Sequence, residues 1–279
     1  MNFSSSFSIG QFIPGESLVH SLDSRCKILC VFIMMAGPFI ASNPLGFIPM
    51  FFFLAAVCRM SGVKIRTVLR SGRPIVFLVV FTAVLNLFWT PGTELVRLGP
   101  LRITKEGLSL AIAMGLRLYF LVMYASMLMM TTSPMAFAAG VEKLMSPLAR
   151  LRVPTAEIAM MMTIALRFIP TLFEETDRIL KAQISRGANF ESGGMLKRAR
   201  SYIPVLVPLF VLVFARAENL ATAMESRCYM PGSPRTRLNP LIWQITDTAA
   251  IIIVSAFIFL SALWSGYAVL LMSRCLDFL

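Results

Sequence analysis

The chain has 279 residues, of which 57% are hydrophobic and only 14% are charged, and its mean hydropathy is +0.76. A soluble domain needs more polar surface than this composition supplies, so the sequence predicts an integral membrane protein. The net charge of +12 does not indicate nucleic-acid binding, because the basic residues cluster beside apolar runs, as the positive-inside rule describes.

The composition also argues against catalysis and against metal or nucleotide binding by this chain. The five cysteines include no C-x-x-C pair, and His20 is the single histidine, so no metal-ligand spacing is present. The chain contains no Gly-Lys pair and hence no phosphate-binding G-x-x-x-x-G-K-[ST] loop. We therefore expect no catalytic residue, no metal and no bound cofactor. The alternatives are an intramembrane enzyme and a stand-alone carrier whose path Asn86 and Arg117 would line.

The first 25 residues, "MNFSSSFSIGQFIPGESLVHSLDSR", lack the early basic region and apolar run of a cleavable signal peptide. We expect them to lie at the membrane surface. No charge occurs between Lys27 and Arg59, and "GPFIASNPLG" interrupts this run, with Pro44 biasing Asn43 away from helix. This pattern predicts a hairpin of two spanning helices.

Residues 59–73 carry five basic side chains and no acid, so this loop and the N-terminus are expected in the cytoplasm. A third span, residues 74–89, leads outward to a short loop, and a fourth, residues 107–131, returns. Arg117 lies about eleven residues into the fourth span, roughly 16 Å along it. It either contacts another subunit or a substrate path, or it snorkels to the interface.

Residues 133–240 form the polar part, with 14 basic and 8 acidic residues. Within it, residues 155–187 show a helical apolar period, with a kink expected at Pro170. Two acid-before-base pairs at i,i+4 support an exposed helix, namely Glu174 with Arg178 and Asp177 with Lys181. Gly187 directly follows Arg186, where a left-handed C-terminal cap favours glycine.

A second helix is expected over residues 201–228. It carries small residues that allow a close helix crossing, namely Ala215, Ala217, Ala221 and Ala223. Leu220, Met224 and Arg227 share one face of it. As an alternative, residues 156–173 and 203–214 form a spanning hairpin. The basic loop between the two helices is expected to touch anionic headgroups through Lys197, Arg198 and Arg200.

The final apolar run, residues 241–272, contains one charge, Asp247. One long tilted helix is favoured over a tight hairpin. The predicted fold is thus an all-α integral membrane protein with about five transmembrane helices. Its parts are an N-terminal transmembrane part (1–132), a cytoplasmic or interfacial helical segment (133–240) and a C-terminal transmembrane helix (241–279).

The two helices of the polar segment end alike, with Ser185, Arg186 and Gly187 in one and Ser226, Arg227 and Cys228 in the other. A single C-terminal arginine is explained by the helix dipole. Two similar endings 41 residues apart indicate more, since arginine's planar fork suits bidentate bonds in a partner's groove. The pattern predicts a partner with two equivalent grooves.

Several segments together resemble one protein family, and they occur in the family's order over nearly the whole chain. They are "GQFIPGESLVHSLDSRCK", "TTSPMAFAAGVEKLMSPL", "IALRFIPTLFEETDRILKAQISRGANF", "KRARSYIPVLVPLFV" and "AMESRCY…RTRLNPL". The family is the transmembrane T component of energy-coupling factor (ECF) transporters, the EcfT/CbiQ family.

The resemblance implies a scaffold of the cell membrane with two cytoplasmic coupling helices, each ending in an x-Arg-x motif, usually Ala-Arg-Gly. These motifs, here Ser185-Arg186-Gly187 and Ser226-Arg227-Cys228, dock on two ATP-binding cassette ATPases. ATP and Mg are handled by those partners, and a separate membrane S component binds the substrate, a vitamin or other micronutrient. Because Cys228 replaces the common glycine, we expect the second helix to end with different geometry.

Overall fold

The computed structural model of the chain describes residues 12–41, 44–98, 101–147, 154–188, 190, 194–230 and 241–276. The chain divides into two compact units. The core unit comprises Gly10–Val141 and Pro240–Leu279, and the two-helix unit comprises Glu142–Asn239 with the first nine residues.

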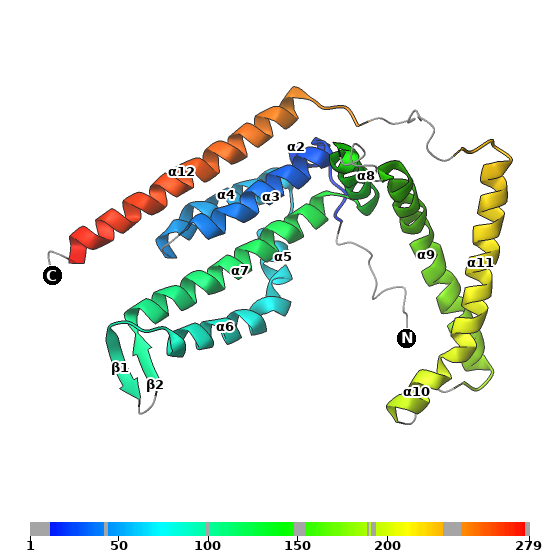
Figure 1. Cartoon of the computed structure of the whole chain (residues 1–279), viewed down its shortest axis with the longest axis horizontal. Helices are drawn as coiled ribbons and strands as arrows, with labels where there is room; N and C mark the ends of the chain where they lie inside the picture. The colour runs from blue at the N-terminus through cyan, green and yellow to red at the C-terminus, as the bar shows by residue number, and fades with distance from the viewer. Residues whose placement is uncertain are drawn as a thin grey trace. The chain divides into compact units, whose positions relative to one another are not determined.

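The core unit is built mainly from helices (Figure 1). In chain order its elements are α2 (Leu18–Ser21), α3 (Ser24–Ile40), η1 (Pro44–Gly46), α4 (Phe47–Ser61), α5 (Ile65–Ser71), η2 (Arg73–Ile75), α6 (Val76–Trp89), β1 (Glu94–Leu98), β2 (Leu101–Thr104), α7 (Lys105–Thr131) and α12 (Ile245–Leu276). Helix α8 (Pro134–Met145) begins in the core unit and ends in the two-helix unit. The two-helix unit contains α9 (Thr155–Ser185), α10 (Met195–Ser201) and α11 (Ile203–Glu225).

The break between the first two predicted spans is confirmed, because α3 ends at Ile40 and α4 begins at Phe47. The final apolar run is one continuous helix, α12, as favoured from the sequence. The basic segment 59–73, expected to be a loop, contains the short helix α5. The loop after the third span is an antiparallel hairpin in which Arg97 pairs with Arg102 and Leu98 with Leu101.

The chain is an all-α membrane protein apart from this hairpin. Within the described residues, six helical segments are long and apolar enough to cross a membrane, namely Pro44–Ser61, Ile65–Trp89, Lys105–Thr131, Thr155–Ser185, Ile203–Glu225 and Ile245–Gly266. The sequence predicted about five, counting α3 and leaving out α9 and α11. With 17 residues, α3 falls slightly short of the roughly 20 that a bilayer needs.

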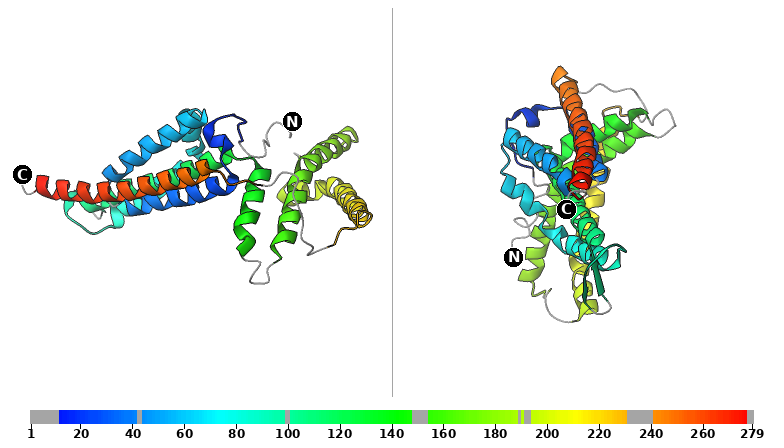
Figure 2. Two further views of the ribbon diagram at one scale, coloured as in Figure 1. Left: turned by 90° about the horizontal axis from the view of Figure 1, so that it is seen from above. Right: turned by 90° about the vertical axis from the view of Figure 1, so that its left-hand side faces the viewer.

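The interior of the core unit lies among α3, α4, α7 and α12, and Figures 1 and 2 show α12 running beside α3. Large buried side chains such as Met50, Leu54 and Met123 fill it. The rings of Phe53 and Phe257 stack at 4.3 Å between centroids. Aromatic pairs of this kind add about 0.5–1.5 kcal/mol beyond their buried area.

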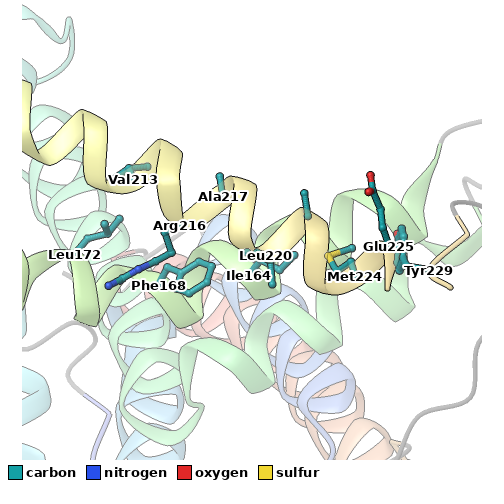
Figure 3. A pocket seen from close by; sticks show the side chains of 11 residues that line it. Ile164, Phe168, Leu172, Val213, Arg216, Ala217, Leu220, Met224, Glu225 and Tyr229 are labelled. Atoms are coloured by element: carbon teal, nitrogen blue, oxygen red, sulfur yellow. The ribbon is translucent and has the colours of Figure 1, made fainter. Parts of the chain in front are cut away.

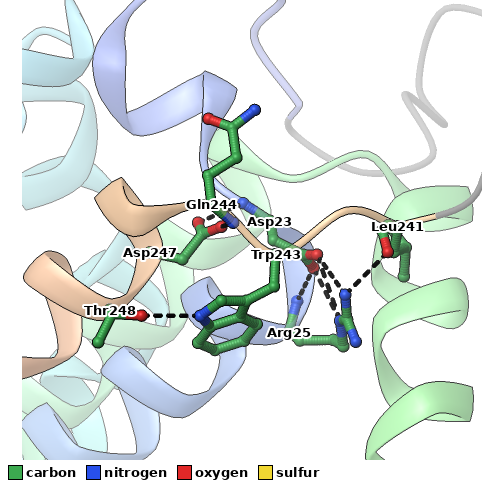
Figure 4. Close-up of polar contacts among 7 residues, drawn as sticks. All are labelled: Asp23, Arg25, Leu241, Trp243, Gln244, Asp247 and Thr248. Atoms are coloured by element: carbon green, nitrogen blue, oxygen red, sulfur yellow. Dashed lines mark hydrogen bonds and ion pairs between the residues drawn. The ribbon is translucent and has the colours of Figure 1, made fainter.

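A polar cluster joins the N-terminal ends of α3 and α12 (Figure 4). The Asp247 carboxylate is 1% exposed and accepts hydrogen bonds from the backbone N–H groups of Asp23 (2.9 Å) and Gln244 (2.8 Å). It therefore satisfies donors that helix starts leave without partners. Asp23 in turn caps α3 and pairs with Arg25 at 2.8 Å, and Arg25 donates to the carbonyl of Leu241.

Asp23 is held ionised by this cluster. Burial raises the pKa of its carboxyl, but the hydrogen bonds and charge of Arg25 outweigh burial and hold the pKa below its ordinary value. The cluster thus fixes the start of the last helix to the start of the first long one, although 224 residues separate Asp23 from Asp247.

Candidate functional site

The site is built on the antiparallel pair α9 and α11 (Figure 3). Between them runs an apolar groove of about 330 Å³. Along it, Leu172 lies with Val213, Phe168 beside Arg216, and Ile164 beside Leu220. Residue numbers fall on one helix as they rise on the other, so the C-terminal end of each helix lies at the opposite end of the pair.

Small and charged side chains hold the pair together. Of the four predicted small residues, Ala217 and Ala221 line the groove, whereas Ala215 and Ala223 do not. The Arg216 guanidinium lies 3.7 Å from Glu175 and 5.8 Å from the centre of the Phe168 ring. Such partly exposed contacts are worth under about 1 kcal/mol each, so they set the register of the helices more than their stability.

The first helix ends in a Schellman motif. Gly187 has a φ of +87°, its N–H donates to the carbonyl of Ile184 (2.9 Å), and the N–H of Ala188 donates to that of Gln183 (3.0 Å). The two bonds satisfy carbonyls that a helix end leaves unpaired. The predicted left-handed cap at Gly187 is confirmed, and Arg186 directly precedes it.

The second helix ends in the same motif, so the expectation of a different geometry was wrong. Cys228 has a φ of +57°, its N–H donates to Glu225 (2.9 Å), and the N–H of Tyr229 donates to Met224 (3.0 Å). Each of these residues stands 41 positions after its counterpart in the first motif. The hydrogen bonds thus impose the left-handed conformation on a residue with a Cβ, at a cost of about 1–2 kcal/mol.

Both arginines are exposed, as are the small residues beside them, Ser185, Gly187, Ser226 and Cys228. The serine hydroxyls bond back to their own helices, Ser185 to Lys181 and Ser226 to Ala223. Arg186 lies 14 residues beyond Leu172, and Arg227 lies 14 beyond Val213, which is about 20 Å along each helix. The pair therefore presents two similar arginine tips at opposite ends, up to about 40 Å apart.

The ion pairs along α9 agree with the sequence in one case and differ in the other. Lys181 pairs with Asp177 as predicted, at 2.5 Å. Arg178 lies 3.9 Å from Glu175, one residue away from its predicted partner Glu174. Glu175 is the carboxylate shared with Arg216, so Arg178 joins the contact between the helices.

The connection between the helices is packed at one point, where Phe190 is buried and its ring lies 5.1 Å from that of Tyr202. Arg198 and Arg200 on α10 are exposed. The side chain of Lys197 lies outside the described residues. Contact of these three residues with lipid headgroups stays a prediction.

Arg117 lies apart from this site, in the core unit. Its Nε donates to the carbonyl of Pro38 at 2.9 Å, and its guanidinium lies 5.2 Å from the centre of the Phe39 ring. Pro38 belongs to the last turn of α3, where carbonyls lack helical partners and a cation is favoured. The chain thus supplies a partner for Arg117, and contact with another subunit stays a prediction.

An exposed apolar face covers the first half of α11. Six large side chains recur there at helical spacing, and each is 46–69% exposed: Ile203, Leu206, Val207, Phe210, Val211 and Phe214. From the sequence, residues 203–214 were predicted only as part of a second helix or, alternatively, as half of a spanning hairpin. Its i, i+3, i+4, i+7 period was the available signal of a binding face.

Among the described residues, no group of three or more His, Cys, Asp or Glu could hold a metal ion. The exposed guanidinium groups of Arg186 and Arg227 can bind a partner by charge and hydrogen bonds.

Comparison with known proteins identifies the family of this chain. The family model for CbiQ, described as a cobalt transport protein, matches residues 15–238. The chain is 53% identical to the energy-coupling factor transporter transmembrane protein EcfT of Thermanaerovibrio acidaminovorans, over 91% of this chain and 95% of the relative. It is 39% identical to the protein of that name from Bacillus subtilis, over 90% and 96%. The chain therefore belongs to the CbiQ/EcfT family and is a multi-pass transmembrane component of an energy-coupling factor transporter.

Proposed function

We propose that this chain is the non-catalytic coupling subunit of the transporter. Arg186 and Arg227 dock in matching grooves of two ATP-binding cassette ATPases, which bind ATP and Mg and perform the hydrolysis. A separate membrane S component binds the transported vitamin or other micronutrient. The observation that supports this function is the pair of equal caps, which present two exposed arginines at opposite ends of one helix pair.

The geometry of the two tips supports a pair of ATPase partners. Each arginine follows a helix end closed by the same two hydrogen bonds, so each tip offers the same guanidinium fork and small neighbours. Two equivalent grooves fit two equivalent tips. When ATP draws the ATPases together, the tips move with them and the angle or spacing of α9 and α11 changes.

The apolar face of α11 supports the position of the S component. An exposed stripe of this kind is unusual unless a lipid or a protein covers it. We place the S component against this stripe, where a movement of α11 reaches it directly. Coupling then requires that its contacts with α11 differ between the ATP-bound and ATP-free states.

We place the subunit in the cell membrane, with the N-terminus and both arginine tips on the cytoplasmic side, where the ATPases have access to ATP. The excess of basic residues in segment 59–73 supports this orientation.

The test is co-purification of the ATPases with variants of this chain, expressed together with the whole transporter. Arg186→Glu and Arg227→Glu should each weaken ATPase retention by about 30-fold or more, because a lost charged contact at an interface costs about 2 kcal/mol or more. The double variant should lose more than either single variant, and ATP-driven uptake should fall with it.

Lys181→Glu is the matched control. Lys181 lies on the same helix five residues before Arg186, and its side chain is 62% exposed. This variant should retain both ATPases, because Lys181 is not part of a cap and its ion pair with Asp177 lies within α9. A double variant with full ATPase content, or a control that loses as much as Arg186→Glu, would refute the docking role.

A further inference from the structure

Two cavities adjoin inside the core unit, near the polar end of α3. One, the polar cavity, is lined by polar and apolar side chains alike and has a volume of about 430 Å³, and the other, the apolar cavity, is almost wholly apolar, with about 270 Å³. Leu22, Lys27 and Thr131 line both. Their volumes together fall within the roughly 300–1,000 Å³ typical of sites for small molecules.

Among the described residues, three that line these cavities carry a buried hydroxyl without a hydrogen-bond partner. Ser24 and Thr132 line the polar cavity and are each 5% exposed. Tyr124 lines the apolar cavity and is 3% exposed. A buried hydroxyl without a partner has given up its hydrogen bonds to water, and most buried polar groups in proteins have a partner. These three groups therefore point to a ligand with oxygen atoms.

Lys27 adds a cation between the cavities. It is 8% exposed, and its ammonium donates to the carbonyls of His20 (2.8 Å) and Thr131 (3.2 Å). An ammonium has three donors, so one stays available. None of the ion pairs found among the described residues involves Lys27.

The two carboxylates that line the polar cavity are already engaged. Asp23 pairs with Arg25, and both oxygens of Asp247 accept hydrogen bonds from backbone N–H groups. The free donor of Lys27 is thus complementary to an anionic oxygen that comes from outside the chain.

We propose that the adjoining cavities hold one glycerophospholipid. Its phosphate lies in the polar cavity, bound by Lys27, Ser24 and Thr132, and one acyl chain fills the apolar cavity. Tyr124 donates to an ester carbonyl. Tyr124 lies seven residues before Thr131 on α7, about 10 Å along the helix, which puts the phenol below a headgroup layer roughly 5–8 Å thick.

The arrangement fits a lipid better than a free anion or water. A free phosphate would leave the apolar cavity empty, and an apolar molecule would leave the third donor of Lys27 and the hydroxyls of Ser24 and Thr132 without acceptors. A phospholipid satisfies both parts, since it carries an anionic phosphate and a hydrocarbon chain in one molecule. This inference is independent of the docking role proposed for Arg186 and Arg227.

The test is native mass spectrometry of the full chain, purified in detergent and supplied with dioleoylphosphatidylglycerol. One lipid should stay bound, and lipid addition should raise the melting temperature. Lys27→Met, which keeps the apolar stem, should lower lipid retention by about tenfold or more, as loss of a charge-assisted hydrogen bond does. Lys64→Met removes a lysine from the exposed start of α5 and should change neither.

A second variant separates ligand binding from a structural role. Ser24→Ala with Thr132→Val removes two unpaired hydroxyls, so it should stabilise the lipid-free protein while weakening lipid retention. Inorganic phosphate and dioleoylglycerol, added separately, should each fail to reproduce the stabilisation. The proposal is overturned if no lipid is retained, if Lys27→Met behaves as Lys64→Met does, or if phosphate alone is sufficient.

Discussion

The best-packed helices of the core unit bury far more of their apolar residues than the helices of the two-helix unit do. In α4 and α7, 33% of the residues in the most apolar window are buried, against 17% in α12, 11% in the segment Ile65–Trp89 and 6% in α9 and α11. The hydropathies of the windows in α4, α7, α9 and α11 are nevertheless alike, between 1.5 and 1.7. Composition therefore does not distinguish a helix that builds a core from one that presents its apolar side chains outward.

The two units also differ in what holds their helices together. The core unit has packed side chains and a polar cluster that fix its helices to one another. The buried residues of the pair α9 and α11 are mainly Thr155, Ala159 and Val205. The pair is therefore held by contacts between the side chains that line its groove and by a few charged contacts. A weakly packed pair can change its crossing angle at low cost, which suits the movement with the ATPases proposed for it.

The largest effect is expected from Asp247→Ala in the core unit. The change leaves two backbone N–H groups without an acceptor, and each costs about 1–3 kcal/mol. We expect the free energy of unfolding to fall by about 2–6 kcal/mol, measured as a lower melting temperature of the detergent-purified protein.

Asp177→Ala in the two-helix unit is the matched control for this effect. It removes a carboxylate whose partner, Lys181, is 62% exposed, so the loss should stay within about 1 kcal/mol. Equal shifts for the two variants would contradict the idea that only the core unit depends on a buried polar cluster.

A smaller effect, limited to assembly, is expected from Phe210→Ala with Phe214→Ala on α11. Both rings are largely exposed, so the stability of the isolated chain should change little. Loss of their contacts should weaken binding of the S component by about 2–4 kcal/mol. Co-purification of the S component with the assembled transporter measures this.

Phe77→Ala with Phe81→Ala on α6 is the comparison variant, since these rings have the same i,i+4 spacing and are 81% and 52% exposed. They should tolerate the change with the S component still bound. If the α6 variant loses the S component and the α11 variant keeps it, the binding face lies on the core unit.

Local sequence signals predicted the helices well. Pro44 marked the break between α3 and α4 because it restricts the residue before it, and Gly187 marked the end of α9 because glycine readily adopts a positive φ. Contacts between distant segments were not predictable in this way. Asp247 was noted as a lone charge, but its partner Asp23 lies 224 residues away, and no local period connects them.

Two predictions from the sequence were wrong, each for its own physical reason. The hairpin of β1 and β2 was read as a loop because its charged residues mask the apolar alternation that indicates strands. The end of α11 was expected to differ from that of α9 because Cys228 has a Cβ. There the hydrogen bonds of the Schellman motif, which depend on the preceding helix, outweigh the intrinsic preference of the residue.

The smallest effect tests the equality of the two tips. Cys228→Gly should stabilise the end of α11 by about 1 kcal/mol, because glycine adopts the left-handed conformation without the penalty of a Cβ. Gly187→Cys should destabilise the end of α9 by a similar amount. Amide hydrogen exchange measures both, at Tyr229 and Ala188, whose N–H groups close the two motifs.

Opposite signs at the two positions would mean that the caps are equal in geometry but unequal in strength, with the second tip the easier one to unwind. Exchange should then slow about fivefold at Tyr229 in Cys228→Gly and quicken about fivefold at Ala188 in Gly187→Cys. Shifts of the same sign would show that the residue after each arginine does not set the strength of its cap. In that case the strength of the cap that precedes Cys228 would come from the contacts that Met224 and Tyr229 make in the groove.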